Sequence, residues 1–125
     1  MKIHLQDPSS SPNLIRAHQP AAITVGEVVY TASLIISPDV LLPDWSPATF
    51  TELEAAHIES LLQLSPELVL IGTGRRQQFP SPEILRPLIR AQVGYEIMDT
   101  GAACRTYNVL AGEGRKVVAG LILVS

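Results

Sequence analysis

The stretch ELVLIGTGRRQQFPSPEILRPLIRAQVGYEIMDTG, residues 67–101, decides the fold class. It opens with an apolar run that does not alternate with polar residues, which is typical of a strand covered on both faces. Ser81-Pro82-Glu83 then supplies a cap followed by proline at the first helical position. Pro87 lies early enough to kink this helix without abolishing it, and Gly94 closes the helix. A second strand follows at 95–98, so the stretch predicts a strand, a helix and a strand.

The rest of the C-terminal half continues this alternation. TGAACRTYNVLAG predicts a helix over 100–112 closed by Gly112, and RKVVAGLILV predicts a last strand over 115–124. Such an order is typical of right-handed crossovers with helices that cover a sheet. The direction of the last strand is left open, because the link from Ala111 to Arg115 is short.

The N-terminal half gives a less definite pattern. Helical spacing of apolar residues predicts a helix over 51–63, opened by Thr51 or Pro47 and ended by Pro66. Runs rich in Val, Ile and Thr predict two antiparallel strands at 28–31 and 33–37, and the alternative is a hairpin that closes at residues 25–27. Residues 1–22 are expected to be an irregular lead-in, since residues 7–20 hold three prolines and little periodicity.

Composition bounds the class of protein. A chain of 125 residues with 46% hydrophobic and 17% charged residues is expected to form one globular domain, residues 23–125. The net charge of −3 argues against a nucleic-acid partner, which needs a basic surface. The single cysteine, Cys104, forms no internal disulfide. With no signal or transit pattern and no apolar run long enough to span a bilayer, we expect a cytoplasmic protein without an integral membrane segment.

The turn Gly72-Thr73-Gly74 is the first candidate binding element. Two glycines permit close backbone approach, which suits a nest of amides for an anion, and Arg75 and Arg76 could add bidentate contacts. The pattern fails as a dinucleotide fingerprint, because Gln77 stands where a third glycine is needed, and it lacks the Gly-Lys-Ser/Thr of a P-loop. The alternative interpretation is a tight exit from a buried strand with solvated arginines.

The second candidate is MDTGAACRTYN, residues 98–108. Asp99 or Thr100 would cap the helix, and the side chain of Arg105 should point back toward the helix start. If the strands at 67–71 and 95–98 are adjacent and parallel, this turn and the Gly-Thr-Gly turn meet at one sheet edge, where ligands bind in open α/β sheets. The alternative is a cap with tight helix packing.

No other motif predicts chemistry. Cys104, among alanines, is interpreted as a small core residue. His4, His18 and His57 lack metal-ligand spacing, so no metal or cofactor is expected. Glu52, Glu54 and Glu59 are interpreted as the solvent-exposed face of a helix. The Gly-x-Ser-x-Gly motif of an α/β-hydrolase nucleophile is absent from the sequence.

The motifs LVLIGTG, FPSPEILRPL and GYEIMDTGAACRTYNVLAGEGRKVVAGLI resemble the MTH-type domain family of unassigned function. Its relatives include mitochondrial complex I assembly factor three and an adipogenesis-associated protein. The resemblance covers residues 23–125 and implies an α/β fold of three layers, with a central mixed, largely parallel sheet, helices on its faces and an N-terminal antiparallel β-ribbon. It implies no enzymatic activity and no catalytic residues. The partners it implies are another protein or a second copy in a homodimer.

Residues from the two turns and from the family motif together make up the candidate crevice: Gly72, Thr73, Gly74, Arg75, Asp99, Thr100, Arg105, Thr106 and Asn108. The leading hypothesis for function is a non-catalytic protein-binding or assembly-factor-like module, which would hold its partner through exposed residues such as Arg75 and Trp45. The alternative is a small-molecule or anion-binding domain, including an enzyme, that uses this crevice.

Overall fold

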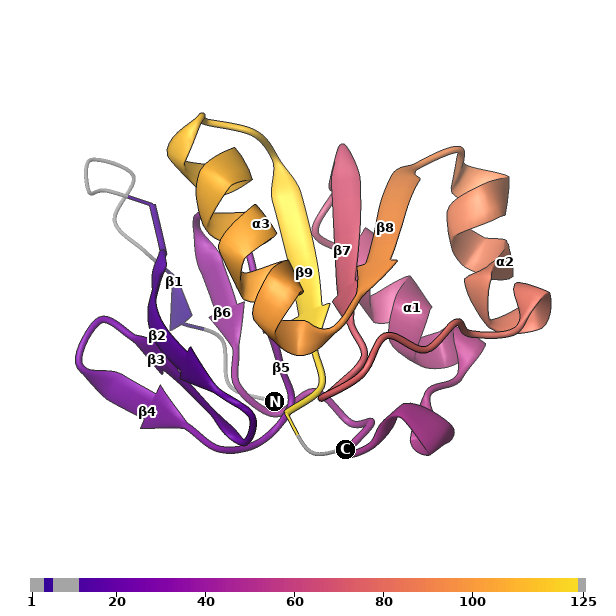
Figure 1. Ribbon diagram of the computed structural model, residues 1–125. Helices are drawn as coiled ribbons and strands as arrows, with labels where there is room; N and C mark the ends of the chain where they lie inside the picture. The colour runs from indigo at the N-terminus through magenta and orange to yellow at the C-terminus, as the bar shows by residue number, and fades with distance from the viewer. Residues whose placement is uncertain (1–3, 6–11, 124–125) are drawn as a thin grey trace.

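The computed structural model describes residues 4–5 and 12–123, and these form two sheets and three α-helices (Figure 1). The central sheet has six strands in the order β1 (His4–Leu5), β6 (Val40–Leu42), β5 (Leu34–Ile36), β9 (Val117–Leu121), β7 (Leu68–Gly72) and β8 (Gly94–Met98). A second, three-stranded antiparallel sheet consists of β2 (Ile15–Gln19), β3 (Ala22–Val25) and β4 (Val28–Tyr30).

The central sheet is mixed, as the family resemblance implies, although two of its strand pairs are parallel and three are antiparallel. Strand β7 pairs with β8 on one side and β9 on the other, both in parallel. Strands β5, β6 and β1 extend the sheet beyond β9 with antiparallel pairs. Parallel pairing is therefore confined to the half of the sheet built from the C-terminal part of the chain, and the direction of the last strand is settled as parallel to β7.

Helices cover both faces of the sheet, which gives three layers (Figure 1). Helix α3 (Thr100–Gly112) and the small sheet lie on one face, whereas α1 (Ala55–Leu62) and α2 (Pro82–Ala91) lie on the other. Because successive side chains of a strand point to opposite faces of the sheet, each strand contributes side chains to both layers. Leu70 packs toward α3, while Val69 and Ile71 pack toward α1 and α2.

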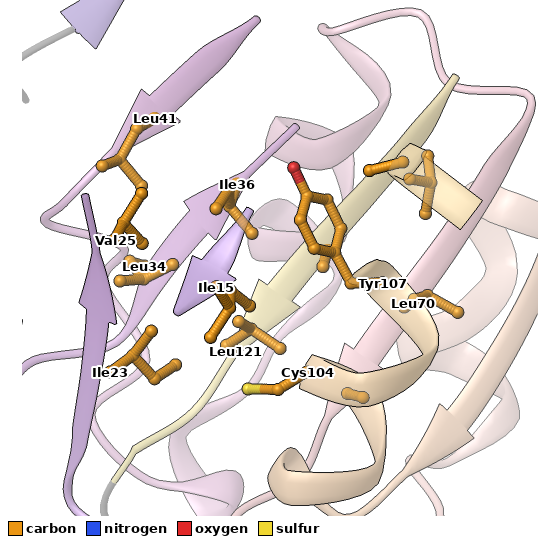
Figure 2. Packing of buried hydrophobic residues seen from close by; sticks show 14 of the residues in the cluster. Ile15, Ile23, Val25, Leu34, Ile36, Leu41, Leu70, Cys104, Tyr107 and Leu121 are labelled. Carbon is orange, nitrogen blue, oxygen red and sulfur yellow. The ribbon is translucent and has the colours of Figure 1, made fainter. Parts of the chain in front are cut away.

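The layer between α3, the small sheet and the central sheet is an apolar core (Figure 2). Ile15 and Ile23 enter it from the small sheet, and Cys104 and Tyr107 enter it from α3. Ile23, Cys104 and Tyr107 are each 0% exposed. The small sheet is thus held to the rest of the molecule by the same core that holds α3.

The N-terminal lead-in is not irregular where the structure describes it. Residues Ile15–Gln19 form strand β2, which pairs with β3, and Ile15 is buried. Prolines flank this strand. Its pairing partner β3 begins at Ala22, directly after the turn, but most of the core against which Ile15 packs comes from residues much later in the chain. The expectation of an irregular segment also falls on residues 1–3 and 6–11, which lie outside the described residues.

The strands predicted at 28–31 and 33–37 do not pair with each other. Strand β4 pairs with β3 across the turn at Gly26-Glu27, which is the alternative hairpin, and β5 pairs with β6 and β9. Gly26 has a φ of 61°, a conformation that favours glycine at such a turn. Thr31 and Ser33 lie between β4 and β5, where the chain passes from the small sheet to the central sheet.

Two predicted helix boundaries are wrong. Residues Phe50–Glu52 form a short 3₁₀ helix, and buried Leu53 is extended, so α1 begins only at Ala55. Helix α2 ends at Ala91 because Gln92 adopts the left-handed conformation with φ 57°, and Gly94 instead begins β8. At the start of α1 the burial of Leu53 sets the boundary, whereas at the end of α2 the left-handed conformation of the exposed Gln92 sets it.

Candidate functional site

The two predicted turns lie side by side at the carboxyl ends of the adjacent parallel strands β7 and β8. Thr73 N donates to Met98 O at 2.9 Å, and Thr100 N donates to Gly74 O at 2.9 Å. Gly74 N in turn donates to the Thr100 hydroxyl at 2.8 Å. The expected meeting of the Gly-Thr-Gly and Asp-Thr-Gly turns at one sheet edge is therefore confirmed.

The hydroxyl of Thr100, at the start of α3, bonds to the backbone segments that follow β7 and β9. Besides accepting from Gly74 N, it donates to Ile122 O at 2.6 Å, directly after β9. Gly72 leaves the space for this arrangement, since a Cβ there would lie 2.9 Å from Thr100 Oγ1 and 3.0 Å from Leu121 Cδ2. Packing and hydrogen bonding within the fold therefore explain both the threonine at position 100 and the glycine at position 72.

Thr73 holds the loop that follows β7. Its side chain is 0% exposed. Its hydroxyl lies 2.6 Å from Arg76 O and 3.2 Å from Met98 O, and it accepts from Gln78 N at 3.1 Å. Gln77 adds a bond from Nε2 to Ile97 O at 2.8 Å. The loop from Gly74 to Phe79 is therefore fixed from both sides rather than free.

A hollow of about 440 Å³ lies beside the paired turns. It is lined by Gly74, Arg75, Asp99, Thr100 and Gly101, together with His18, Gln19 and Pro20. Its volume lies in the range of small-molecule pockets. Four of the nine residues predicted for the crevice thus line one hollow.

The charged groups at this hollow have separate roles. Asp99 caps α3 by accepting from Ala102 N at 2.9 Å, and Arg75 is exposed. A Cβ at Gly101 would lie 3.4 Å from His18 Cε1 and 3.5 Å from Arg105 Nη1. The side chain of Arg105 therefore reaches back to the helix start, as predicted. Gly101 lies between this side chain, the His18 ring and the carboxylate of Asp99, whose Oδ1 would be 3.4 Å from the same Cβ.

The remaining predicted residues lie away from the hollow. Thr106 is half-buried on α3, more than a turn beyond Thr100. Asn108 lies further still and binds the backbone of β2: it accepts from Ile15 N at 2.8 Å and donates to Ile15 O at 2.7 Å. Its position in the sequence motif is explained by this contact with the small sheet.

Three lining residues were missed because they belong to β2 and the turn after it. His18, Gln19 and Pro20 fall in the segment that was expected to be irregular. No spacing in the sequence links them to the glycine turns, which lie more than fifty residues later. Only the packing of the small sheet on α3 brings them there.

Burial changes the acid chemistry of two side chains on α3. Loss of solvent raises the pKa of the Cys104 thiol to about 12, and the nearby Arg105 opposes this shift only in part. Burial also raises the pKa of Tyr107, whose hydroxyl donates to Asn13 O at 2.7 Å. The interpretation of Cys104 as a core residue is confirmed by its 0% exposure.

Trp45 is a correction to the expected exposed surface. It is only 4% exposed, because its ring packs over Gly120 and its Nε1 donates to His57 O at 3.3 Å. A Cβ at Gly120 would lie 2.6 Å from Trp45 Cη2. The tryptophan is therefore a core residue under α1, and of the two residues named for partner contact only Arg75 is accessible.

Two features of residues 4–5 and 12–123 bear on the kind of site. No group of three or more His, Cys, Asp and Glu side chains there is placed to hold a metal ion. No helix of that part of the chain has the length and apolar character needed to cross a membrane.

Comparison with known proteins identifies the family to which the chain belongs. A protein family described as "Protein of unknown function (DUF498/DUF598)" matches residues 15–122. The chain belongs to this family. The match begins at β2, so it includes the strand that carries His18.

The structures of some relatives of this DUF498/DUF598 chain are known. A solution structure of a Bordetella pertussis protein described as a Mth938-like domain has 32% identity and a TM-score of 0.79, over 98% of this chain and 92% of that one. This confirms the resemblance to the MTH-type domain.

Two named relatives are longer than the part they share with this chain. The bovine "NADH dehydrogenase [ubiquinone] 1 alpha subcomplex assembly factor 3" is 31% identical over 75% of this chain and 54% of its own length. The "13 kDa major membrane protein" of Francisella tularensis is 37% identical over 52% of this chain and 53% of its own length. The chain spans about half the length of both relatives.

Proposed function

We propose that the protein is a non-catalytic protein-binding module of the assembly-factor kind, which contacts its partner through the loop after β7. The observation that carries this proposal is Phe79. Its side chain is 70% exposed, the largest exposed fraction among the large apolar side chains of the described residues. Exposed aromatic residues of this kind are frequent anchors of protein interfaces.

The loop presents Phe79 in a fixed position. Buried Thr73 binds the backbone at Arg76 and Gln78, and Pro80 on the other side of Phe79 is buried. A loop backbone that is already ordered loses little conformational entropy on binding, so burial of Phe79 in a partner contributes more to affinity. The exposed arginines Arg75 and Arg76 begin the same loop and favour an acidic partner surface.

The comparisons support this proposal at a coarser level. The bovine relative is named an assembly factor. At the candidate crevice, the hydroxyls of Thr73 and Thr100 donate hydrogen bonds to backbone carbonyl groups. A protein rather than a nucleic acid is the proposed partner, in line with the net charge of −3. We retain the cytoplasm as the proposed compartment; cell fractionation that recovers the protein in the membrane pellet would contradict it.

The experiment is quantitative capture from the native cell with the tagged protein and with two serine variants. Phe79→Ser removes the proposed anchor, and Val109→Ser is the matched control, because Val109 is 59% exposed on α3. Recovery of a reproducible partner should fall at least tenfold with Phe79→Ser and stay unchanged with Val109→Ser. Equal recovery with both variants would exclude the loop as the contact.

A second candidate function is anion or small-molecule binding in the hollow beside the glycine turns. The observation that favours it is that Arg105 reaches back to Gly101 at the first turn of α3, with Arg75 on the rim of the same hollow. Positive groups next to the start of a helix attract anions. Phosphate, nucleotides and small carboxylates should then raise the melting temperature. The rise should be lost in Arg75→Ala and Arg105→Ala but not in Arg90→Ala, whose arginine lies on α2.

A further inference from the structure

Four strands lie at the edges of the two sheets: β1 and β8 in the central sheet, and β2 and β4 in the small sheet (Figure 1). Strands β1 and β4 have two and three residues, so they offer few backbone groups to a further strand. Strand β2 packs against α3, whose Asn108 bonds to both backbone groups of Ile15. Strand β8 has five residues and is the other long edge strand among the described residues.

The hydrogen bonds between β8 and β7 fix which backbone groups of β8 point outward. Thr73 N donates to Met98 O, so Met98 directs its backbone groups toward β7. In a parallel pair, alternate residues of a strand bond to the same neighbour, so Glu96 also points toward β7. Tyr95 and Ile97 consequently direct their N–H and C=O groups away from the sheet.

One of these four outward groups has a partner. Gln77 Nε2 donates to Ile97 O at 2.8 Å. Within residues 4–5 and 12–123, Tyr95 N, Tyr95 O and Ile97 N make no hydrogen bond. Glu96, which lies between them, is exposed, so solvent reaches this part of the strand. Free donors and acceptors on alternate residues are the groups with which an added β-strand pairs.

The open edge of β8 leads directly to the loop that carries Phe79. Gln77, whose side chain touches the edge, stands two residues before Phe79, which is 70% exposed. Arg75 and Arg76 begin the same loop and are exposed. The carboxyl end of the edge is therefore flanked by an accessible aromatic ring and two cations.

We propose that β8 is a docking edge, to which the partner protein adds an extended segment as a seventh strand of the central sheet. The segment pairs its backbone with Tyr95 and Ile97 and places an aspartate or glutamate next to Arg75 and Arg76. In binding of this kind the main-chain hydrogen bonds supply affinity, and alternate side chains supply specificity.

The two faces of β8 define which side chains the segment should carry. Tyr95 and Ile97 are half-buried and pack against the core on the α1 and α2 face. Glu96 is in register with Leu70, so it lies on the α3 face, where it is exposed. Because paired strands share their faces, the segment should place apolar residues beside Tyr95 and Ile97 and a polar or basic residue beside Glu96.

The inference rests on the proposed function, because it takes a protein as the partner, and it deepens that function by naming the form in which the partner binds. A second copy of the chain is a poorer occupant. If two β8 strands paired antiparallel so that Tyr95 of each copy met Ile97 of the other, the two Glu96 side chains would lie directly opposite on one face. Like charges in that position destabilise a strand pair.

The test uses linear peptides selected from a random phage-displayed library against the folded protein. A synthetic copy of a selected peptide is titrated while amide hydrogen exchange is followed by NMR. In the free protein the Glu96 amide should exchange slowly because it bonds to β7, and the Tyr95 and Ile97 amides should exchange faster. Saturation with the peptide should slow exchange at Tyr95 and Ile97 at least tenfold and leave Glu96 little changed.

Methylation of single peptide nitrogens shows whether the backbone makes the contact, and it leaves the protein unaltered. Affinity should fall at least tenfold when a methyl group replaces a hydrogen that faces β8. It should change little at the nitrogens between these, which point away from β8. The effect of methylation should therefore alternate along the peptide.

Two pairs of substitutions test the charge of the peptide end. Arg75→Ala with Arg76→Ala should weaken peptide binding at least fivefold, and high salt should reduce this difference. Arg115→Ala with Lys116→Ala is the matched control, because it removes two adjacent exposed cations before β9, at the opposite end of the sheet. The control should bind the peptide as the unaltered protein does.

Several outcomes would overturn the docking edge. They are a library that yields no peptide, a bound peptide that leaves Tyr95 and Ile97 unprotected, and a methylation scan without alternation. Protection of these two amides that grows with protein concentration in the absence of peptide would also overturn it, because a second copy would then occupy the edge.

Failure of the proposed function gives a different result. If the peptide protects the edge but Phe79→Ser leaves capture of the native partner unchanged, the edge stands and the Phe79 contact has failed. If capture depends on Phe79 while the captured partner leaves Tyr95 and Ile97 unprotected, the Phe79 contact stands and the docking edge has failed.

Discussion

The side chain of Asn108 binds both backbone groups of Ile15, a residue 93 positions earlier in the chain. Ile15 N donates to Oδ1 at 2.8 Å, and Nδ2 donates to Ile15 O at 2.7 Å. The amide therefore imitates a neighbouring β-strand and covers the outer edge of β2. It holds the small sheet to α3, and through β2 it positions His18 at the rim of the hollow.

Asn108→Ala should lower the free energy of unfolding by about 2 kcal/mol, because it leaves a donor and an acceptor of β2 without partners in a part-buried place. Urea unfolding gives the magnitude, and the exchange rate of the Ile15 amide hydrogen should rise more than that of amides in β7. Asn108→Asp keeps the acceptor for Ile15 N but sets a carboxylate against Ile15 O, so it should be at least as destabilising. A stable aspartate variant would show that Nδ2 contributes nothing.

Thr100 offers a test of whether its hydroxyl serves the fold. Thr100→Ser keeps the bonds to Gly74 N and Ile122 O, whereas Thr100→Val removes both in a buried place. We expect the valine variant to lose about 1–3 kcal/mol of stability and the serine variant to lose clearly less. Ser33→Ala is the matched control, because the buried Ser33 hydroxyl has no partner among the described residues and its removal should cost nothing. Equal losses for serine and valine would contradict a role for these bonds.

The elements that local signals define were predictable. The Ser81-Pro82 start of α2 and the unbroken apolar run of β7 each act within a few residues and were predicted correctly, and Asp99 is one of the two caps predicted for α3. The meeting of the two glycine turns followed from the rule that parallel neighbours end at one edge. That prediction required β7 and β8 to be adjacent and parallel, as they are.

What could not be predicted depends on contacts between distant residues. Strand β2 is flanked by prolines, and its outer edge is held by Asn108, 93 positions beyond Ile15, which no local pattern connects to it. Trp45 was taken as exposed because the glycine that makes room for its ring lies 75 positions later, at Gly120. Because β2 is also distant in sequence from the glycine turns, the residues that line the hollow at the start of α3 were predicted, whereas those from β2 and its turn were not.

Trp45 and Gly120 should behave as one unit. Gly120→Ala places a methyl group 2.6 Å from Trp45 Cη2 and 3.1 Å from Leu61 Cδ2, so buried atoms must shift. We expect a loss of about 1–3 kcal/mol and a changed tryptophan emission spectrum. Trp45→Phe alone leaves a gap, and combining the two should cost less than the sum of the single changes. Strict additivity in this cycle, measured by urea unfolding, would show that the alanine is accommodated elsewhere.

Cys104 gives the stability a dependence on alkaline pH. Burial raises its pKa from an ordinary 9.0 to about 12, so the folded protein keeps the thiol proton while the unfolded chain releases it. Where the unfolded state binds fewer protons, the free energy of unfolding falls as pH rises. The contribution of Cys104 is therefore complete below pH 9.0 and is lost progressively as pH rises toward about 12. Buried Tyr107, whose pKa is also raised, acts in the same direction at higher pH.

Cys104→Ala should consequently flatten the first part of this decline. Urea unfolding at neutral pH and at several pH values above 9.0 gives the free energy for both proteins, and their difference should shrink or reverse as pH rises. The native protein should also react with a thiol reagent only as fast as it opens, and urea should abolish that protection. The loss of packing from the alanine is constant with pH, so a parallel pair of curves would mean that Cys104 ionises as freely in the folded protein as in the unfolded chain.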